Sequence, residues 1–434
     1  GSLNYDYASK YLLSLKMRSD GSSRLASGNR WSTFPSVSAA WRISSESFME
    51  KTQIFLNDLK IRASWGLTGA TTGVGLYPSY STIGFGNAAL GNQYILSAYL
   101  SGLGNTDLGW EKTSMLDFGF DARLLDNRLG VTFDYYLKNT KDILIGLPVP
   151  LEYGFGKPNV NIGELQNNGW EVELSWNDKI GEFRYGIQAN LSNNKNEVKD
   201  LGGTSPWKDG YTAEGLAMNS YYGYEALGLF QTEEEVANSP VYSRRYAKPG
   251  DVKYKDQNND GVIDADDRVV LGDRDPHYLF GVTLNGAWKG FDFSVFLQGV
   301  GKRNYILDGP SIRPLSDQGK GPAFEHQLDY WTEDNRDAKY PRLLEATSSL
   351  GFNHMTSDFW MINAGYLRLK NLQVGYNFSN DLLKNTGFSN IRLYFSANNL
   401  FTISNFTPGY DPETLNAFTY PLSRTYSFGL NLQF

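Results

Sequence analysis

Apolar and polar residues alternate one by one in short runs along most of this chain. The last run, residues 425–434, shows the pattern plainly, because every second residue is apolar and the residues between are polar or very small. Its apolar members are Tyr426, Phe428, Leu430, Leu432 and Phe434. Alternation with a period of two puts each kind of side chain on its own face of a β-strand. A run of about ten residues is also long enough for a tilted strand to cross a bilayer.

The same pattern recurs in about twelve segments, which predicts an all-β chain of antiparallel strands. The expected strands are 11–18, 36–43, 59–67, 116–123, 131–137, 170–176, 183–191, 280–288, 291–297, 367–378, 391–397 and 425–434. Within 367–378 the alternation changes phase at Lys370 or Asn371, which predicts a β-bulge. Charges fall on one face of the segments, and that face would line the inside of a closed barrel. The expected interior residues are Arg62, Glu171, Glu173, Arg184, Gln188 and Asn190.

The links between these segments alternate in length. The shorter links are 45–57, 125–128, 177–181, 289–290 and 379–390, and the longer ones are 69–109, 142–163, 193–276, 302–363 and 403–423. Outer-membrane barrels have short periplasmic turns on one rim and long extracellular loops on the other. The parity of the links therefore favours a transmembrane β-barrel over a soluble sandwich. Helix-like spacing of Phe48, Ile54 and Phe55 also predicts a short helical connector within 45–57.

Composition agrees with this reading and excludes several classes of protein. Aromatic residues make up 15% of the 434 residues, and Cys is absent, which rules out disulfides and zinc-thiolate sites. Mean hydropathy is -0.42, and no run of about 18 apolar residues occurs that could form a transmembrane helix. A net charge of -7 and a pI near 5.2 argue against a nucleic-acid partner.

One stretch carries the sequence pattern of a cation-binding loop. Residues 256–267 match the EF-hand-type pattern D-x-[DN]-x-[DN]-G, with Gly261 at the sharp turn and Ile263 directed toward a core. The expected ligands are Asp256, Asn258, Asp260, Val262 through its carbonyl, Asp264 and Asp267. Oxygen ligands suit Ca²⁺, and Asp in place of the usual final Glu leaves Mg²⁺ open. The alternative is a solvated acidic loop without metal. The ion would order a long loop, 193–276, and no organic cofactor is expected.

The sequence offers little for an enzyme. The three histidines, His277, His326 and His354, lack the spacing of a zinc site. No nucleophile elbow, phosphate-binding loop or dinucleotide motif occurs. The acidic clusters 233–235 and 333–334 are typical of solvated surfaces, although a glycosidase pair would use the same residue types. We therefore expect a protein that is not an enzyme.

Several stretches together resemble the SusC/RagA-like TonB-dependent transporters of the Bacteroidota outer membrane. They are Asn4-Tyr5-Asp6-Tyr7, Arg18-Ser19-Asp20-Gly21, Arg30-Trp31, Phe34-Pro35-Ser36-Val37, Leu59-Lys60-Ile61-Arg62, Pro249-Gly250-Asp251-Val252, Asn398-Asn399-Leu400-Phe401 and Gly409-Tyr410-Asp411-Pro412-Glu413. The resemblance covers the whole chain. It implies a barrel of about 22 strands with a plug domain. The terminal aromatic strand 425–434 also resembles the signal read by the barrel-assembly machinery.

The resemblance further implies import of oligosaccharides or peptides, driven by TonB-ExbB-ExbD and assisted by a SusD-like surface lipoprotein. Residues 1–434 would then be the C-terminal half of the barrel, embedded in outer-membrane lipid, with the signal peptide, the plug and the TonB-contacting segment absent. Such a piece would leave two unpaired edges in lipid and should not transport alone. One alternative is a soluble, secreted, calcium-stabilised β-protein that binds or cleaves glycans. Another is a complete small barrel of about twelve strands that acts as a passive pore or as an outer-membrane enzyme.

Overall fold

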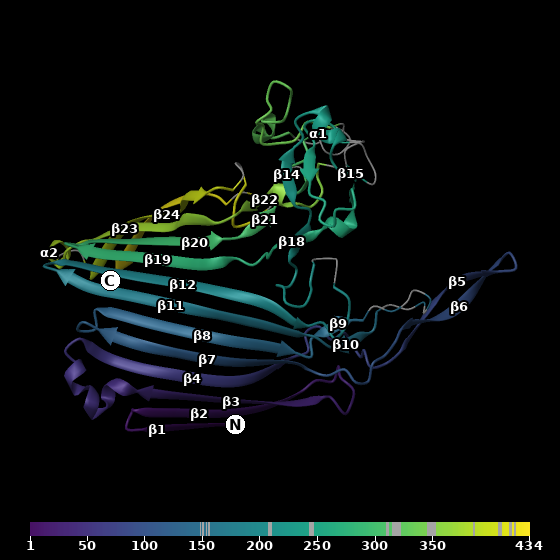
Figure 1. Cartoon of the computed structure of the whole chain (residues 1–434). Coiled ribbons are helices and arrows are strands. Elements are labelled where there is room, and N and C mark those ends of the chain that lie inside the picture. Colours follow the sequence, from purple (N-terminus) through teal and green to yellow (C-terminus); the bar gives the residue numbers. More distant parts are fainter. Residues whose placement is uncertain are drawn as a thin grey trace. The chain divides into compact units, whose positions relative to one another are not determined.

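The computed structural model of this chain consists almost entirely of β-strands and the loops between them (Figure 1). It describes residues 1–147, 149, 152, 154, 157–206, 211–242, 247–309, 312–314, 323–344, 353–384, 387–406, 410–415, 419–420 and 422–434. Parts of the predicted loops, and Gly409 of the sequence motif, lie outside these residues. Within the described ranges, no helix has the length and apolar character needed to span a membrane.

Thirteen strands form one antiparallel sheet, in the order β1-β2-β3-β4-β7-β8-β11-β12-β19-β20-β23-β24-β25. Their bounds are β1 Ser2–Tyr7, β2 Tyr11–Gly21, β3 Trp31–Arg42, β4 Leu56–Ala70, β7 Glu111–Leu124, β8 Leu129–Lys141, β11 Glu164–Ile180, β12 Phe183–Asp200, β19 His277–Trp288, β20 Phe291–Lys302, β23 Tyr366–Asn377, β24 Asn390–Ser404 and β25 Thr425–Gln433. The all-β prediction is confirmed, and every predicted strand overlaps one of these. The predicted count missed β1, whose six residues are shorter than a typical bilayer-crossing strand.

The chain divides into two compact units. Unit 1 comprises residues 1–177, 192–208 and 212–218, and unit 2 comprises 178–191, 209–211 and 219–434.

In unit 1, large apolar side chains occupy one face of the sheet, here called the apolar face. One line of cross-strand neighbours on it is Tyr5, Leu13, Ala39, Ala63, Phe118 and Tyr135. The opposite side, the polar face, carries the line Asn4, Ser14, Ser38, Ser64, Asp117 and Tyr136. The side chain at every second position therefore returns to the same face in each strand, as the alternation predicts.

Unit 2 has the same two faces. Its apolar face includes the line Phe293, Val374, Phe395 and Phe428, and its polar face includes Ser294, Gln373, Ser396 and Ser427. The predicted bulge is confirmed, because the β23–β24 register shifts between Leu369 and Asn371. The β20–β23 register shifts at the matching place, between Phe296 and Leu297.

The short links and the long links lie at opposite ends of the strands in both units (Figure 1). The predicted connector between β3 and β4 contains two 3-10 helices, Ile43–Ser45 and Ser47–Thr52. In unit 1 the long link between β4 and β7 includes a hairpin of β5 (Thr82–Leu90) and β6 (Gln93–Gly102) that extends beyond the sheet. Near its base, Leu25, Val74 and Leu108 form a small buried cluster.

In unit 2 the described parts of 219–276 and 304–363 fold together into what we call the loop lobe (Figure 1). Its elements are β13 Tyr221–Gly223, β14 Ala226–Leu229, α1 Glu233–Ala237, β15 Val241–Tyr242, β16 Val252–Tyr254, β17 Val262–Ile263, β18 Val269–Gly272, β21 Asn304–Ile306, β22 Met361–Asn363 and the 3-10 helices Ala265–Asp267, Glu325–Leu328 and Asp358–Trp360. Two further small elements of the sheet regions are the pair β9 Leu144–Gly146 with β10 Asn159–Asn161, and α2 Asn380–Leu383. The loop lobe has an apolar core of Phe230, Tyr242, Val252, Tyr254 and Ile263.

Candidate functional site

The polar face of unit 1 carries a network of charged side chains around Arg62. Its guanidinium donates to Asp121 of the neighbouring strand β7 at 3.0 Å and reaches Asp134 of β8, two strands away, at 3.0 Å. Lys60 also pairs with Asp121 at 2.8 Å. Gly119 lies between Arg62 and Asp134 in the register, and a Cβ at that position would collide with the Asp134 carboxylate. The glycine therefore permits an ion pair across an intervening strand.

Beside this network the polar face is hollowed by a depression of about 660 Å³. Its lining is Arg62, Ser64, Met115, Asp117, Asp134, Tyr136, Lys138, Asn167, Glu171 and Asn194. The lining offers hydroxyl, amide and carboxylate groups. Tyr136 and Asn194 are hydrogen-bonded to each other at 3.3 Å. In the described part of the chain, Asp117 and Glu171 form no ion pair of their own. The predicted interior residues Arg62 and Glu171 are thus brought together here, and Glu173 follows on the same face of β11.

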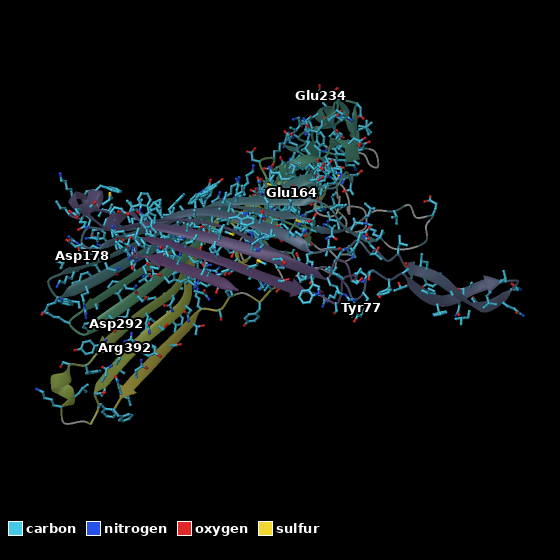
Figure 2. All side chains as sticks on the ribbon, turned by 90° about the horizontal axis from the view of Figure 1, so that it is seen from below. Tyr77, Glu164, Asp178, Glu234, Asp292 and Arg392 are labelled. Atoms are coloured by element: carbon cyan, nitrogen blue, oxygen red, sulfur yellow. The ribbon has the colours of Figure 1, made fainter. Side chains whose placement is uncertain are left out.

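The polar face of unit 2 holds a second ion pair that crosses a strand. Arg392 of β24 binds Asp292 of β20 through Nε at 3.0 Å and Nη2 at 2.5 Å, and Figure 2 shows the two residues next to each other. Asn377 donates to the same carboxylate at 2.8 Å. Gly375, on the intervening strand β23, leaves room for the Arg392 side chain, since a Cβ at Gly375 would lie 2.5 Å from Nη2 of Arg392. The predicted interior residues Arg184, Gln188 and Asn190 lie on β12, in the part of that strand that belongs to unit 2.

Arg368 is a functional candidate that the sequence pattern did not single out. It lies on β23, its side chain is 1% exposed, and it binds Asp411 at 2.6 Å and Glu413 at 2.5 Å. Its Nε also donates to Thr402 Oγ1 at 2.9 Å. Lys370 pairs with Glu413 at 3.0 Å. The long link between β24 and β25 is thereby fastened to the sheet by buried charges.

A second buried charge fastens two long links to each other within the loop lobe. The Asp251 side chain is 2% exposed and accepts bonds from Arg342 at 2.7 Å and from Asn353 at 2.9 Å. The backbone N–H of Lys248 donates to the same carboxylate at 2.8 Å. A carboxylate with this many donors is fully hydrogen-bonded despite its burial. Asp251 and Asp411 both belong to stretches that carry the family resemblance, and this was the signal that could have marked them.

The acidic loop 256–267 has the predicted shape. Gly261 has a φ of +82°, in the region that favours glycine, and Ile263 is buried in the lobe core at 3% exposure. The ligand types fit a hard cation, but their oxygens are engaged by backbone N–H groups. Asp256 accepts from Asn259 and Gly261 at 2.6 and 2.8 Å, and the remaining carboxylates accept similar bonds.

Asp267, fully buried, closes the loop by accepting from Gln257 and Asp264, each at 2.8 Å. Asn258 and Asp260 are joined side chain to side chain at 3.1 Å, and Val262 pairs with β15. Within the described ranges, no three Asp, Glu or His side chains are arranged to hold a metal ion. Cation binding by this loop stays a prediction.

Four of the five apolar residues of the terminal run lie on the exposed apolar face of β25, and Phe434 directly follows that strand. Their exposed fractions are 58% for Tyr426, 84% for Phe428, 54% for Leu430, 44% for Leu432 and 85% for Phe434. Phe434 contacts Phe388 with ring centroids 5.0 Å apart. This is the geometry of a membrane-facing strand. Its role as an assembly signal stays a prediction.

Comparisons with known proteins agree with this geometry. Residues 1–400 match the family model "TonB dependent receptor-like, beta-barrel". Over its whole length the chain is 32% identical to TonB-dependent receptor P3 of Formosa agariphila and 30% identical to TonB-dependent receptor SusC of Bacteroides thetaiotaomicron. It spans 45% and 43% of those two proteins.

Among solved structures, the chain is similar to the RagAB peptide transporter, with a TM-score of 0.81 and 26% identity over 99% of the chain and 47% of that protein. The match to the family model covers most of the sequence and the structural match covers nearly all of it. The apolar face is therefore the face that meets the lipid of the bacterial outer membrane. The chain belongs to the TonB-dependent receptor family and supplies part of its outer-membrane β-barrel.

Proposed function

We propose that the complete receptor containing this chain is a TonB-dependent outer-membrane importer of oligosaccharides or peptides that works with a SusD-like surface lipoprotein. The observation that carries the proposal is the whole-chain match to SusC and to the RagAB peptide transporter. The polar face supports it, because the depression around Asp117 offers hydrogen-bonding groups suited to hydroxyl- and amide-rich solutes. The soluble, calcium-stabilised alternative is not favoured, because its exposed apolar face would have no lipid to cover it.

The β5–β6 hairpin supports the partner assignment. No charged residue occurs between 63 and 106, and the hairpin exposes large apolar side chains, including Phe85 at 70%, Tyr94 at 86% and Leu96 at 74%. A two-stranded hairpin is marginally stable alone in water. Such a hairpin on the rim of the long loops suits the surface of a protein partner.

Import would be tested in the source bacterium with the receptor gene intact, deleted or restored. We expect a labelled oligosaccharide or peptide mixture to enter intact cells and to stop entering in the deletion strain. A proton ionophore should also stop entry, because TonB-dependent import draws on the proton gradient. Entry that persists with the ionophore would contradict TonB dependence.

The partner would be tested by co-purification of the tagged receptor with its surface lipoprotein. Tyr94→Ser with Leu96→Ser should reduce the amount of lipoprotein recovered, because both side chains are exposed on the hairpin that we propose contacts the lipoprotein. Ile54→Ser is the matched control, since Ile54 is equally exposed at 86% but lies on the short-link rim. Equal loss in both variants would argue against docking on the hairpin.

A further inference from the structure

The apolar face of unit 1 contains a hollow of about 710 Å³. Two small residues, Ala39 and Ala63, are direct cross-strand neighbours at its centre. Large side chains line it, namely Tyr5, Leu13, Trp41, Ile61 and Phe118. Leu13 precedes the two alanines in the register and Phe118 follows them. The hollow therefore results from a gap in an otherwise continuous line of bulky residues.

One wall of the hollow is held rigid by hydrogen bonds at the short-link rim. The rings of Tyr7, Tyr11 and Trp41 stack in sequence, with centroids 6.4 and 6.3 Å apart. Glu46, in the connector after β3, accepts from the Tyr11 hydroxyl at 2.7 Å and from the Trp41 indole N–H at 3.2 Å. Both rings are thereby fixed, and the hollow exists before any ligand enters.

The same carboxylate also pairs with a cation at this rim. Lys10 lies 3.3 Å from Glu46, and the two side chains are 31% and 15% exposed. Tyr11 is the first residue of β2 and Trp41 is the last but one of β3, so this wall stands at the end of the strands. Aromatic rings with a polar tip are typical of the boundary between headgroups and acyl chains.

We propose that this hollow binds one acyl chain of a glycerophospholipid, with the headgroup at the rim near Tyr11 and Trp41. The surrounding solvent on this face is lipid, and an unfilled apolar hollow forfeits packing contacts. Arg62 also borders the hollow, but its guanidinium is paired with Asp121 and Asp134 on the polar face. The short-link rim faces the periplasm in outer-membrane barrels, where the leaflet supplies such lipids. Because Glu46 already pairs with Lys10, binding follows the acyl chain and is indifferent to headgroup charge.

The test uses the complete receptor, transferred to nanodiscs with equal amounts of phosphatidylethanolamine and phosphatidylglycerol and then examined by native mass spectrometry. We expect one retained phospholipid, drawn equally from both kinds. Ala39→Leu with Ala63→Leu should fill the hollow and lower the retained fraction about tenfold, which corresponds to lost contact with about two methylene groups. Ala189→Leu is the control, because Ala189 lies between Ile187 and Leu191, which are exposed on another part of the apolar face.

A second variant keeps the test decisive if the filled protein fails to fold. Glu46→Gln retains the shape of the side chain but weakens its hold on the two rings, and we expect a smaller loss of retained lipid with the fold intact. Retention unchanged in the folded variants would overturn the proposal. A wild-type receptor with twice the mass of the Ala39→Leu, Ala63→Leu variant would overturn the proposal as well. The hollow would then be occupied by a second receptor and not by a lipid.

Discussion

Removing the Arg368 side chain charge should free the β24–β25 link from the sheet. In Arg368→Met the Asp411 carboxylate, 16% exposed, loses its ion partner, while Glu413 retains Lys370. Breaking a buried pair by removing one partner costs about 3 to 5 kcal/mol. We expect a destabilisation of the link of about 3 kcal/mol, at the lower end of this range, because Glu413 is one-third exposed and keeps a partner. The Met side chain preserves most of the buried apolar stem, so packing changes little.

Hydrogen exchange of the complete receptor in detergent measures this change directly. A loss of about 3 kcal/mol should speed exchange in the described parts of the link, such as Phe406 and Glu413, about 100-fold. Lys370→Met is the matched control, since Lys370 is 30% exposed and its pair contributes about 1 kcal/mol or less. Exchange in Arg368→Met that stays within about threefold of the wild type would refute the assignment of a buried anchor.

Three further changes test the loop lobe. Arg342→Met should lower its free energy of unfolding by about 3 kcal/mol, because Asp251 stays buried without its cation, and adding Asp251→Asn should restore part of the loss in thermal unfolding. Burial raises the pKa of Tyr254 well above 10.0, so the lobe is fully stable below pH 10 and loses stability above it, as the unfolded chain ionises first. An alkaline titration of lobe unfolding in which Tyr254→Phe behaves like the wild type would contradict this. Calcium at millimolar concentration should raise the lobe's free energy of unfolding by about 1 kcal/mol if the acidic loop binds it with the affinity of extracellular modules, and Asp267→Asn should abolish this increase.

The strands could be predicted because their signal is local. Each face is set by side chains two residues apart, so every predicted segment is found in the sheet. The β5–β6 hairpin was missed because its strands lack a clean alternation: Gln93–Gly102 includes the consecutive residues Tyr94, Ile95 and Leu96. A turn signal was present at Gly91-Asn92, where both residues have positive φ, and this pair suits a two-residue hairpin turn.

The buried charge networks could not be predicted from alternation, because their partners lie far apart in sequence. Arg368 and Asp411 are separated by 43 residues, and Asp251 and Arg342 by 91. Periodicity places Arg368 on a face of β23 but says nothing about which loop folds back onto it. The acidic loop shows the converse. Its turn and its core residue could be predicted from twelve consecutive positions. Cation binding by the loop depends instead on the positions of its oxygen atoms, which the sequence does not determine.

Two arginines of the polar face are neutralised by carboxylates of the same face. Arg62 with Asp134 and Arg392 with Asp292 each span an intervening strand, and each needs a glycine in between. Cations that are already paired exert little long-range attraction on a charged solute, since the fields of close opposite charges cancel. Among the described residues of unit 1, Asp117, Glu171 and Lys138 line the depression without an ion pair. In the proposed importer, discrimination among solutes by charge would fall to these two carboxylates, to Lys138 and to the long loops. Substitution of the paired residues should therefore disturb the wall, whereas substitution of these two carboxylates should change which solutes are favoured.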